Sequence, residues 1–234
     1  MKGRRARGAG RRPERAPLHA WYRALLRAYG PQGWWPGRTR FEVIAGAFLT
    51  QNTAWSNVEK GLRSLRRAGL LHPGRMHRAG PGVTAPLLRP TGYFNQKAKR
   101  LHAFLDFLVA EHRGRLDRLF ALPLPNLRER LLRLEGVGPE TADSIILYAG
   151  RRPVFVIDAY TRRILKRHGH LHPHETYEDL RRRFEAALPS EVPLYNEYHA
   201  LIVRLAKDRC RSRIPDCRGC PLERFLPPSG PRRD

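Results

Sequence analysis

The chain has 234 residues and carries 45 lysines and arginines against 21 aspartates and glutamates, a formal net charge of +24. This length can bury one core, or two subdomains that share a cleft. The positive field favours a polyanionic partner, most often nucleic acid. The plainer alternative is a ribosomal or chromatin-like protein, which binds nucleic acid through charge alone. The sequence has no 18-residue apolar run and no apolar signal segment, so we expect no membrane span and an intracellular, cytoplasmic and nucleoid-associated protein.

Nearly every periodic segment has helical spacing, so the expected fold class is all-α. Residues 1–17 are rich in arginine and are expected to form a disordered basic arm, and residues 227–234 a tail. Breakers such as Gly30-Pro31 and the Gly80–Gly82 stretch are expected in the connections. The apolar run 154–157 is short enough to be an extended connector. The helices expected in chain order cover residues 19–29, 41–51, 56–68, 95–112, 115–121, 126–134, 141–149, 159–168, 176–187 and 196–207.

The most informative stretch is LEGVGPETADSIILYAGRRPVFVIDAY, residues 134–160. Its turn of Gly136, Val137 and Gly138 joins two segments with helical apolar spacing. Uncovered backbone N–H groups and the start of the second helix can then cradle a phosphate. Asp158 follows the apolar connector and opens another helix. A phosphate grip and a carboxylate at a fixed separation indicate chemistry on nucleic acid.

These motifs resemble the helix-hairpin-helix, Gly/Pro-rich, Asp superfamily of DNA glycosylases, whose best-known member is endonuclease III. The specific pieces are LEGVGPETAD, VIDAYTRRIL and a late cysteine cluster. The stretches FLTQNTAW, GYFNQKAKRL and YNEYHALIV look closest to the branch with 3-methyladenine DNA glycosylases. The resemblance implies a helical bundle of residues 41–151 and a second subdomain of residues 18–40 plus 152–226, with DNA in the cleft between them.

Asp158 is the predicted catalytic residue. Cleavage of an N-glycosidic bond develops oxocarbenium character on the sugar, which a fixed carboxylate stabilises while it orients a water. A helix N-cap role is the alternative, and it is compatible with catalysis. In lyase-competent relatives a lysine occupies the hairpin position that holds Glu140 here, and no lysine lies between Gly136 and Ile157. Glu140 is therefore expected to tune Asp158 or position water, or else to be a first-turn acid favoured by the helix dipole.

The family extrudes its target base, so an aromatic base pocket is expected. A cationic alkylated adenine is attracted to an indole face. The alternative is that the tryptophans pack the amino-terminal helix against the bundle. Trp55 is the tryptophan that we expect to stack on the base. The candidate pocket residues are Trp34, Trp35, Trp55, Phe48 and Lys207.

Other residues are expected to contact DNA. The resemblance implies that Gln51, with Asn52 beside it, fills the space left by the base, and that Tyr93 wedges into the opposite strand. Their alternatives are an ordinary helix-end polar residue and a half-buried loop aromatic. The further DNA-binding candidates are Gly136, Val137, Gly138, Thr141, Asn95 and Lys97, with Lys99, Arg100, Arg162, Arg163 and Lys166 as weaker phosphate contacts.

All the cysteines, Cys210, Cys217 and Cys220, follow a C-x6-C-x2-C pattern. This pattern resembles the first three ligands of the family's 4Fe–4S loop, whose fourth position here holds Leu226. Thiolates normally supply all four ligands. The resemblance implies a structural 4Fe–4S cluster held by three cysteines with a water or oxygen ligand. An empty loop and a zinc site completed by His or Asp remain alternatives.

The sequence therefore predicts a monofunctional DNA glycosylase of base excision repair that acts as a monomer on damaged double-stranded DNA, with a preference for alkylated purines. One alternative is an endonuclease III-type glycosylase and AP lyase that excises oxidised pyrimidines. The other is a non-catalytic protein that binds distorted DNA through hairpin and charge.

Overall fold

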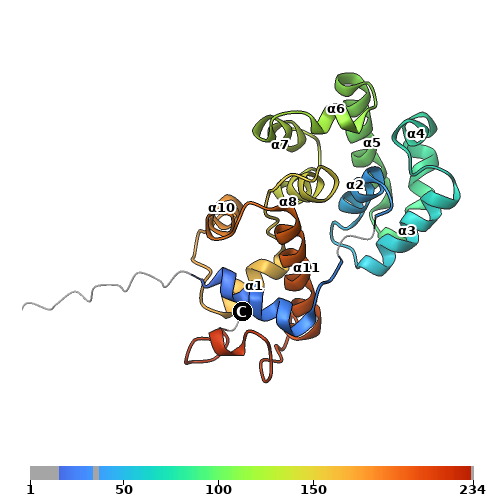
Figure 1. Cartoon of the computed structure of the whole chain (residues 1–234). Helices are drawn as coiled ribbons and strands as arrows, with labels where there is room; N and C mark the ends of the chain where they lie inside the picture. Colours follow the sequence, from blue (N-terminus) through green and yellow to red (C-terminus); the bar gives the residue numbers. More distant parts are fainter. Residues whose placement is uncertain (1–15, 34–36, 233–234) are drawn as a thin grey trace, which may run out of the picture.

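The computed structural model describes residues 16–33 and 37–232, and within them it contains helices and no strand (Figure 1). This confirms the all-α prediction. The helices are α1 (Leu18–Tyr29), α2 (Arg40–Leu49), α3 (Trp55–Arg67), α4 (Pro73–Leu87), α5 (Phe94–His112), α6 (Leu116–Phe120), α7 (Leu124–Leu132), α8 (Pro139–Ser144), a π-helical turn (Ile145–Ala149), α9 (Ala159–Arg167), α10 (Tyr177–Ala187) and α11 (Val192–Asp208), with short 3₁₀ turns at Arg89–Thr91 and Glu223–Phe225.

Helix α4 is absent from the sequence prediction, which read its glycines and prolines as a connection. The structure bends the helix at Gly80, whose φ of 78° and ψ of 166° are non-helical. Pro81 then starts the second half, in the position where a missing N–H costs a helix nothing. A glycine followed by proline therefore marks a kink here rather than the end of the helix.

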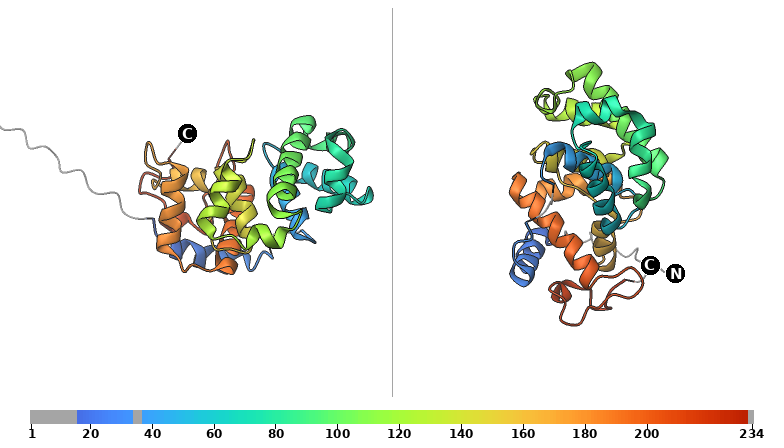
Figure 2. Two further views of the ribbon diagram at one scale, coloured as in Figure 1. Left: turned by 90° about the horizontal axis from the view of Figure 1, so that it is seen from above. Right: turned by 90° about the vertical axis from the view of Figure 1, so that its right-hand side faces the viewer.

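The helices form two groups along the molecule (Figure 2). Helices α2 to α8 pack on one another. Helix α1 packs instead against α10 and α11, which come from the other end of the chain. Large aromatic residues fill the second group, where the rings of Phe155 and Phe184 stack at 4.3 Å between centroids. The boundaries of the two subdomains, residues 41–151 and residues 18–40 plus 152–226, stay a prediction.

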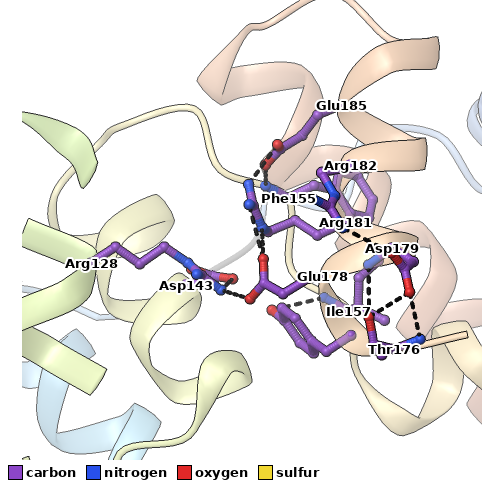
Figure 3. Close-up of polar contacts among 11 residues, drawn as sticks. Arg128, Asp143, Phe155, Ile157, Thr176, Glu178, Asp179, Arg181, Arg182 and Glu185 are labelled. Carbon is purple, nitrogen blue, oxygen red and sulfur yellow. Dashed lines mark hydrogen bonds and ion pairs between the residues drawn. The ribbon is translucent and has the colours of Figure 1, made fainter. Parts of the chain in front are cut away.

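A network of charged side chains joins the two groups (Figure 3). Arg128 on α7 donates to the buried Asp143 on α8 at 2.7 and 3.1 Å, and also to Glu178 on α10. Arg181 connects Glu178 to Glu185, which accepts a hydrogen bond from the backbone N–H of Phe155 at 2.9 Å. The network therefore anchors the extended segment that leads to Asp158.

The ends of the chain differ in what the structure describes. The basic arm lies almost entirely outside the described residues. At the other end, residues 227–232, predicted to be a tail, lie against the protein: the N–H of Arg232 donates to the carbonyl of Arg167 at 3.0 Å. No helix among the described residues is both long and apolar enough to cross a membrane.

Candidate active site

A cavity of about 630 Å³ lies between the α2–α3 turn, the start of α8, the start of α9 and α11. This volume is within the range of small-molecule binding sites. The cavity collects seven residues predicted from four separate parts of the sequence. They are Gln51, Asn52, Trp55, Glu140, Thr141, Asp158 and Lys207.

Asp158 lies on the cavity wall and is 8% exposed. It is the N-cap of α9: its Oδ1 accepts hydrogen bonds from the N–H of Thr161 at 2.7 Å and from the Thr161 hydroxyl at 2.8 Å. Burial alone would raise the pKa of Asp158, but interactions with His199 and Thr161 outweigh it and hold that pKa below its ordinary value. The predicted N-cap is confirmed, and the carboxylate is ionised at neutral pH.

Glu140 lies in the first turn of α8 and lines the same cavity. Desolvation, and then the negative charge of Asp158, raise the pKa of Glu140 to about 7. The two carboxyl groups thus differ in protonation near neutral pH. Such a divergence is typical of acid–base pairs in active sites.

Gln51 connects the α2–α3 turn to the hairpin. Its amide nitrogen donates to the carbonyl of Gly136 at 2.9 Å and to the Thr141 hydroxyl at 3.1 Å, while Arg100 donates to its amide oxygen at 2.8 Å. Gly136 has a φ of 78°, and a Cβ there would lie 2.3 Å from the Arg100 side chain. Only glycine is compatible with both this conformation and this contact.

Two of the predicted site residues do not lie where the prediction placed them. Lys97 is buried and is not a surface phosphate contact, because its ammonium group donates to the carbonyls of Leu49 and Thr91 at 2.9 and 2.7 Å and to the Thr53 hydroxyl. Phe48 is 1% exposed and packs against Phe104 in the core, so it does not line the cavity. Both sit on helix faces that turn inward, which a local motif does not reveal.

The other predicted residues are spread more widely. Tyr93 is 75% exposed in a left-handed conformation at the start of α5, and Asn95, two residues later, is also exposed; neither lines the cavity. Val137 is buried inside the hairpin. Arg163 donates to backbone carbonyls of the protein itself. Trp34 and Trp35 lie outside the described residues.

The three cysteines line one small cavity together with Leu226. Its volume of about 10 Å³ is roughly enough for one water. The Cys210 sulfur accepts a hydrogen bond from Arg167 at 3.3 Å, and burial raises the thiol pKa of Cys217 and of Cys220. Within residues 16–33 and 37–232, no three His, Cys, Asp or Glu side chains are placed to hold a metal ion. The three candidate ligands thus line one cavity, which in this conformation has room for about one water.

Comparison with known proteins agrees with this geometry. Residues 45–190 match the model of the HhH-GPD superfamily of base excision DNA repair proteins. The chain belongs to this superfamily. The matched region contains the hairpin, Glu140 and Asp158 of this HhH-GPD protein.

Individual relatives cover most of this HhH-GPD chain. A Methanocaldococcus jannaschii protein named as a candidate DNA repair glycosylase is 42% identical over 206 residues, which are 87% of this chain and 93% of that protein. Endonuclease III of Sulfolobus acidocaldarius is 30% identical, over 81% of this chain and 83% of its own. The crystal structure of Helicobacter pylori 3-methyladenine DNA glycosylase bound to 1,N6-ethenoadenine has a TM-score of 0.69 at 27% identity and covers 82% of this chain and 97% of that one.

Sequence reasoning missed His199 and Tyr148 at this site. His199 lies 3.4 Å from Asp158, and Tyr148 contacts His199. The stretch YNEYHALIV contains His199 and was singled out as a family match, which is the one signal that could have found it. Helical spacing only places this histidine on the buried face of α11. The packing of α11 on α9, whose N-cap is Asp158, brings it to that carboxylate.

Proposed function

We propose that this protein is a monofunctional DNA glycosylase that hydrolyses the N-glycosidic bond of damaged bases in double-stranded DNA, with alkylated purines preferred. The observation that carries the proposal is an ionised, fixed Asp158 on the wall of a base-sized cavity, next to the hairpin and Trp55. The ethenoadenine named in the structure of the H. pylori relative supports a purine ligand.

The proposed reaction begins with extrusion of the damaged nucleotide into the cavity. Trp55 lines the cavity from the start of α3 and would stack on the base, and an alkylated, cationic base would gain from its indole face. Asp158 stabilises the positive charge that develops on the sugar as the base departs. Water then attacks the sugar, and the products are the free base and an abasic site.

Outside the cavity, the Gly136–Gly138 hairpin would bind the DNA backbone and the exposed Tyr93 would enter the duplex. Gln51 lies between hairpin and cavity, where it can fill the gap left by the base. We propose that the protein acts as a monomer.

An AP lyase of the endonuclease III type is the second candidate, because Lys207 lines the cavity from α11. Its amine would have to attack the sugar and form an imine. The absence of lysine between Gly136 and Ile157 favours water as the nucleophile.

The function is tested with duplexes that each carry one lesion, with released bases identified by mass spectrometry. We expect release of 3-methyladenine or another alkylated purine, and no covalent adduct after borohydride treatment. An adduct that disappears in Lys207→Ala would establish the lyase alternative. Binding to damaged duplex without release of any base would instead identify a non-catalytic damage-binding protein.

Glu140 is proposed to orient the attacking water and accept its proton. Because its pKa is about 7, base release in a single turnover should rise as the pH passes from below to above 7 and Glu140 ionises. Glu140→Gln should lose this rise and should be slower than the wild type above pH 7 by roughly tenfold or more. Glu129→Gln, an exposed acid on α7, is the matched control. An unchanged pH profile in Glu140→Gln would remove this role.

The cysteine loop is proposed to hold a 4Fe–4S cluster through Cys210, Cys217 and Cys220, with a structural role and no step in the reaction. Binding would require the small cavity to open, with the side next to Leu226 left to a non-protein ligand. Protein purified without oxygen should absorb near 400 nm, and Cys217→Ser should lose this absorbance. Zinc at one atom per chain, or no metal, would contradict the cluster.

A further inference from the structure

His199 is a buried histidine of α11 that lies beside Asp158 on the cavity wall. It is 5% exposed, and its Nε2 is 3.4 Å from Oδ2 of Asp158. Its Nδ1 is 2.5 Å from the hydroxyl of Tyr148, which is also buried and belongs to the π-helical turn. The three side chains come from three elements. Tyr148 contacts His199, and His199 contacts Asp158 on the cavity wall.

The two oxygens of Asp158 have different surroundings. Oδ1 is held by the backbone N–H and the hydroxyl of Thr161, whereas Oδ2 faces His199. A carboxylate can only accept, so we assign the Nε2 proton of His199 to the side of Asp158. Nδ1 is then the acceptor for the Tyr148 hydroxyl, and Tyr148 selects the tautomer and the ring orientation.

We infer that His199, oriented by Tyr148, is a positioning residue that keeps Asp158 ionised and directed at the substrate. The inference rests on the proposed function, in which Asp158 acts as an anion. In this role His199 acts on the reaction through Asp158. The separation of 3.4 Å is longer than an ideal hydrogen bond, and such contacts commonly shorten when substrate binds.

Other titratable groups surround the pair. Glu140 from α8, Tyr160 from α9 and Lys207 from α11 line the same cavity, and Tyr148 lies behind His199. The charge of Asp158 raises the pKa of Glu140 and His199 lowers it, while His199 and Thr161 favour ionisation of Asp158. Burial raises the pKa of Asp158, and His199, the largest opposing influence, lowers it together with Thr161, which agrees with the proposed role.

The first test measures the titration of the Asp158 carboxyl carbon by NMR in the free protein. His199→Leu, which removes both ring nitrogens, should raise the Asp158 pKa by about one unit or more. His199→Gln, whose amide can replace Nε2 as a donor, should restore part of the shift, and Tyr148→Phe should give a smaller rise. His112→Leu, the same change at a buried histidine of α5, should leave Asp158 unaffected. An unchanged Asp158 pKa in His199→Leu overturns the inference.

The second test measures base release in a single turnover across pH. In the Glu140→Gln background, which lacks the rise near pH 7, the remaining acidic limb should move upward by about one pH unit in His199→Leu and should move back in His199→Gln. A uniform loss of rate without this movement would show a merely structural role and overturn the inference. If His199→Leu fails to fold, Tyr148→Phe decides: an Asp158 pKa equal to that of the wild type contradicts the inference. If the wild type releases no base, the proposed function fails, whereas the NMR titration still decides the role of His199.

Discussion

Replacing Asp158 with asparagine should lower base release in a single turnover on the order of 10³-fold while the protein stays folded. Asparagine has nearly the same shape but cannot stabilise positive charge on the sugar. Asparagine is also a good N-cap, so its side-chain oxygen can still accept the hydrogen bond from the Thr161 N–H that Asp158 accepts now. The substitution therefore separates the catalytic role of Asp158 from its structural one.

The measurement combines a rate assay on methylated duplex with thermal unfolding and duplex binding. Asp117→Asn, an exposed aspartate of α6 paired with Arg40, makes the same chemical change away from the cavity and should leave the rate unaltered. Base release by Asp158→Asn at the rate of the wild type would eliminate the proposed mechanism. A large loss of stability in Asp158→Asn would show that the structural role dominates.

Replacing Lys97 with methionine should lower the free energy of unfolding by about 2–4 kcal/mol. The ammonium group donates to the carbonyl of Leu49 at the end of α2, to the carbonyl of Thr91 in the 3₁₀ turn and to the hydroxyl of Thr53 on the cavity wall. Replacement of a buried charge by an apolar side chain can be harmless when its partners are replaced too. Here two partners are backbone carbonyls, which would be left buried without this donor.

Thermal unfolding measures this effect. A loss of about 2–4 kcal/mol corresponds to a drop in Tm of roughly 5–15 °C for a protein of this size. Lys99→Met is the matched control, because Lys99 lies two residues away and only pairs with the exposed Glu135 at 3.1 Å; it should change Tm very little. Equal Tm values for Lys97→Met and the wild type would show that the Lys97 contacts do not contribute to stability.

Local patterns were sufficient for most of the fold. Apolar spacing predicted ten helical segments, because each helix packs through one apolar stripe. The residues of that stripe recur at helical spacing within a single segment of the sequence. The missed helix α4 shows the limit of such patterns. Gly80 and Pro81 forbid a straight helix but allow a bent one, and packing against α5 decides for the bent form.

The hairpin and Asp158 were found from the sequence because their chemistry depends on local requirements: a glycine at positive φ, and a carboxylate at a helix start. The positions of Lys97, Phe48 and His199 depended on tertiary structure. The basic segment around Lys97 predicts a phosphate contact, but in the folded protein its ammonium group donates to backbone carbonyls of Leu49 and Thr91. A histidine on a helix acquires a role only when another helix brings a carboxylate within 3.4 Å. Burial and long-range electrostatics arise from which surfaces meet, and a single stretch of sequence does not contain that information.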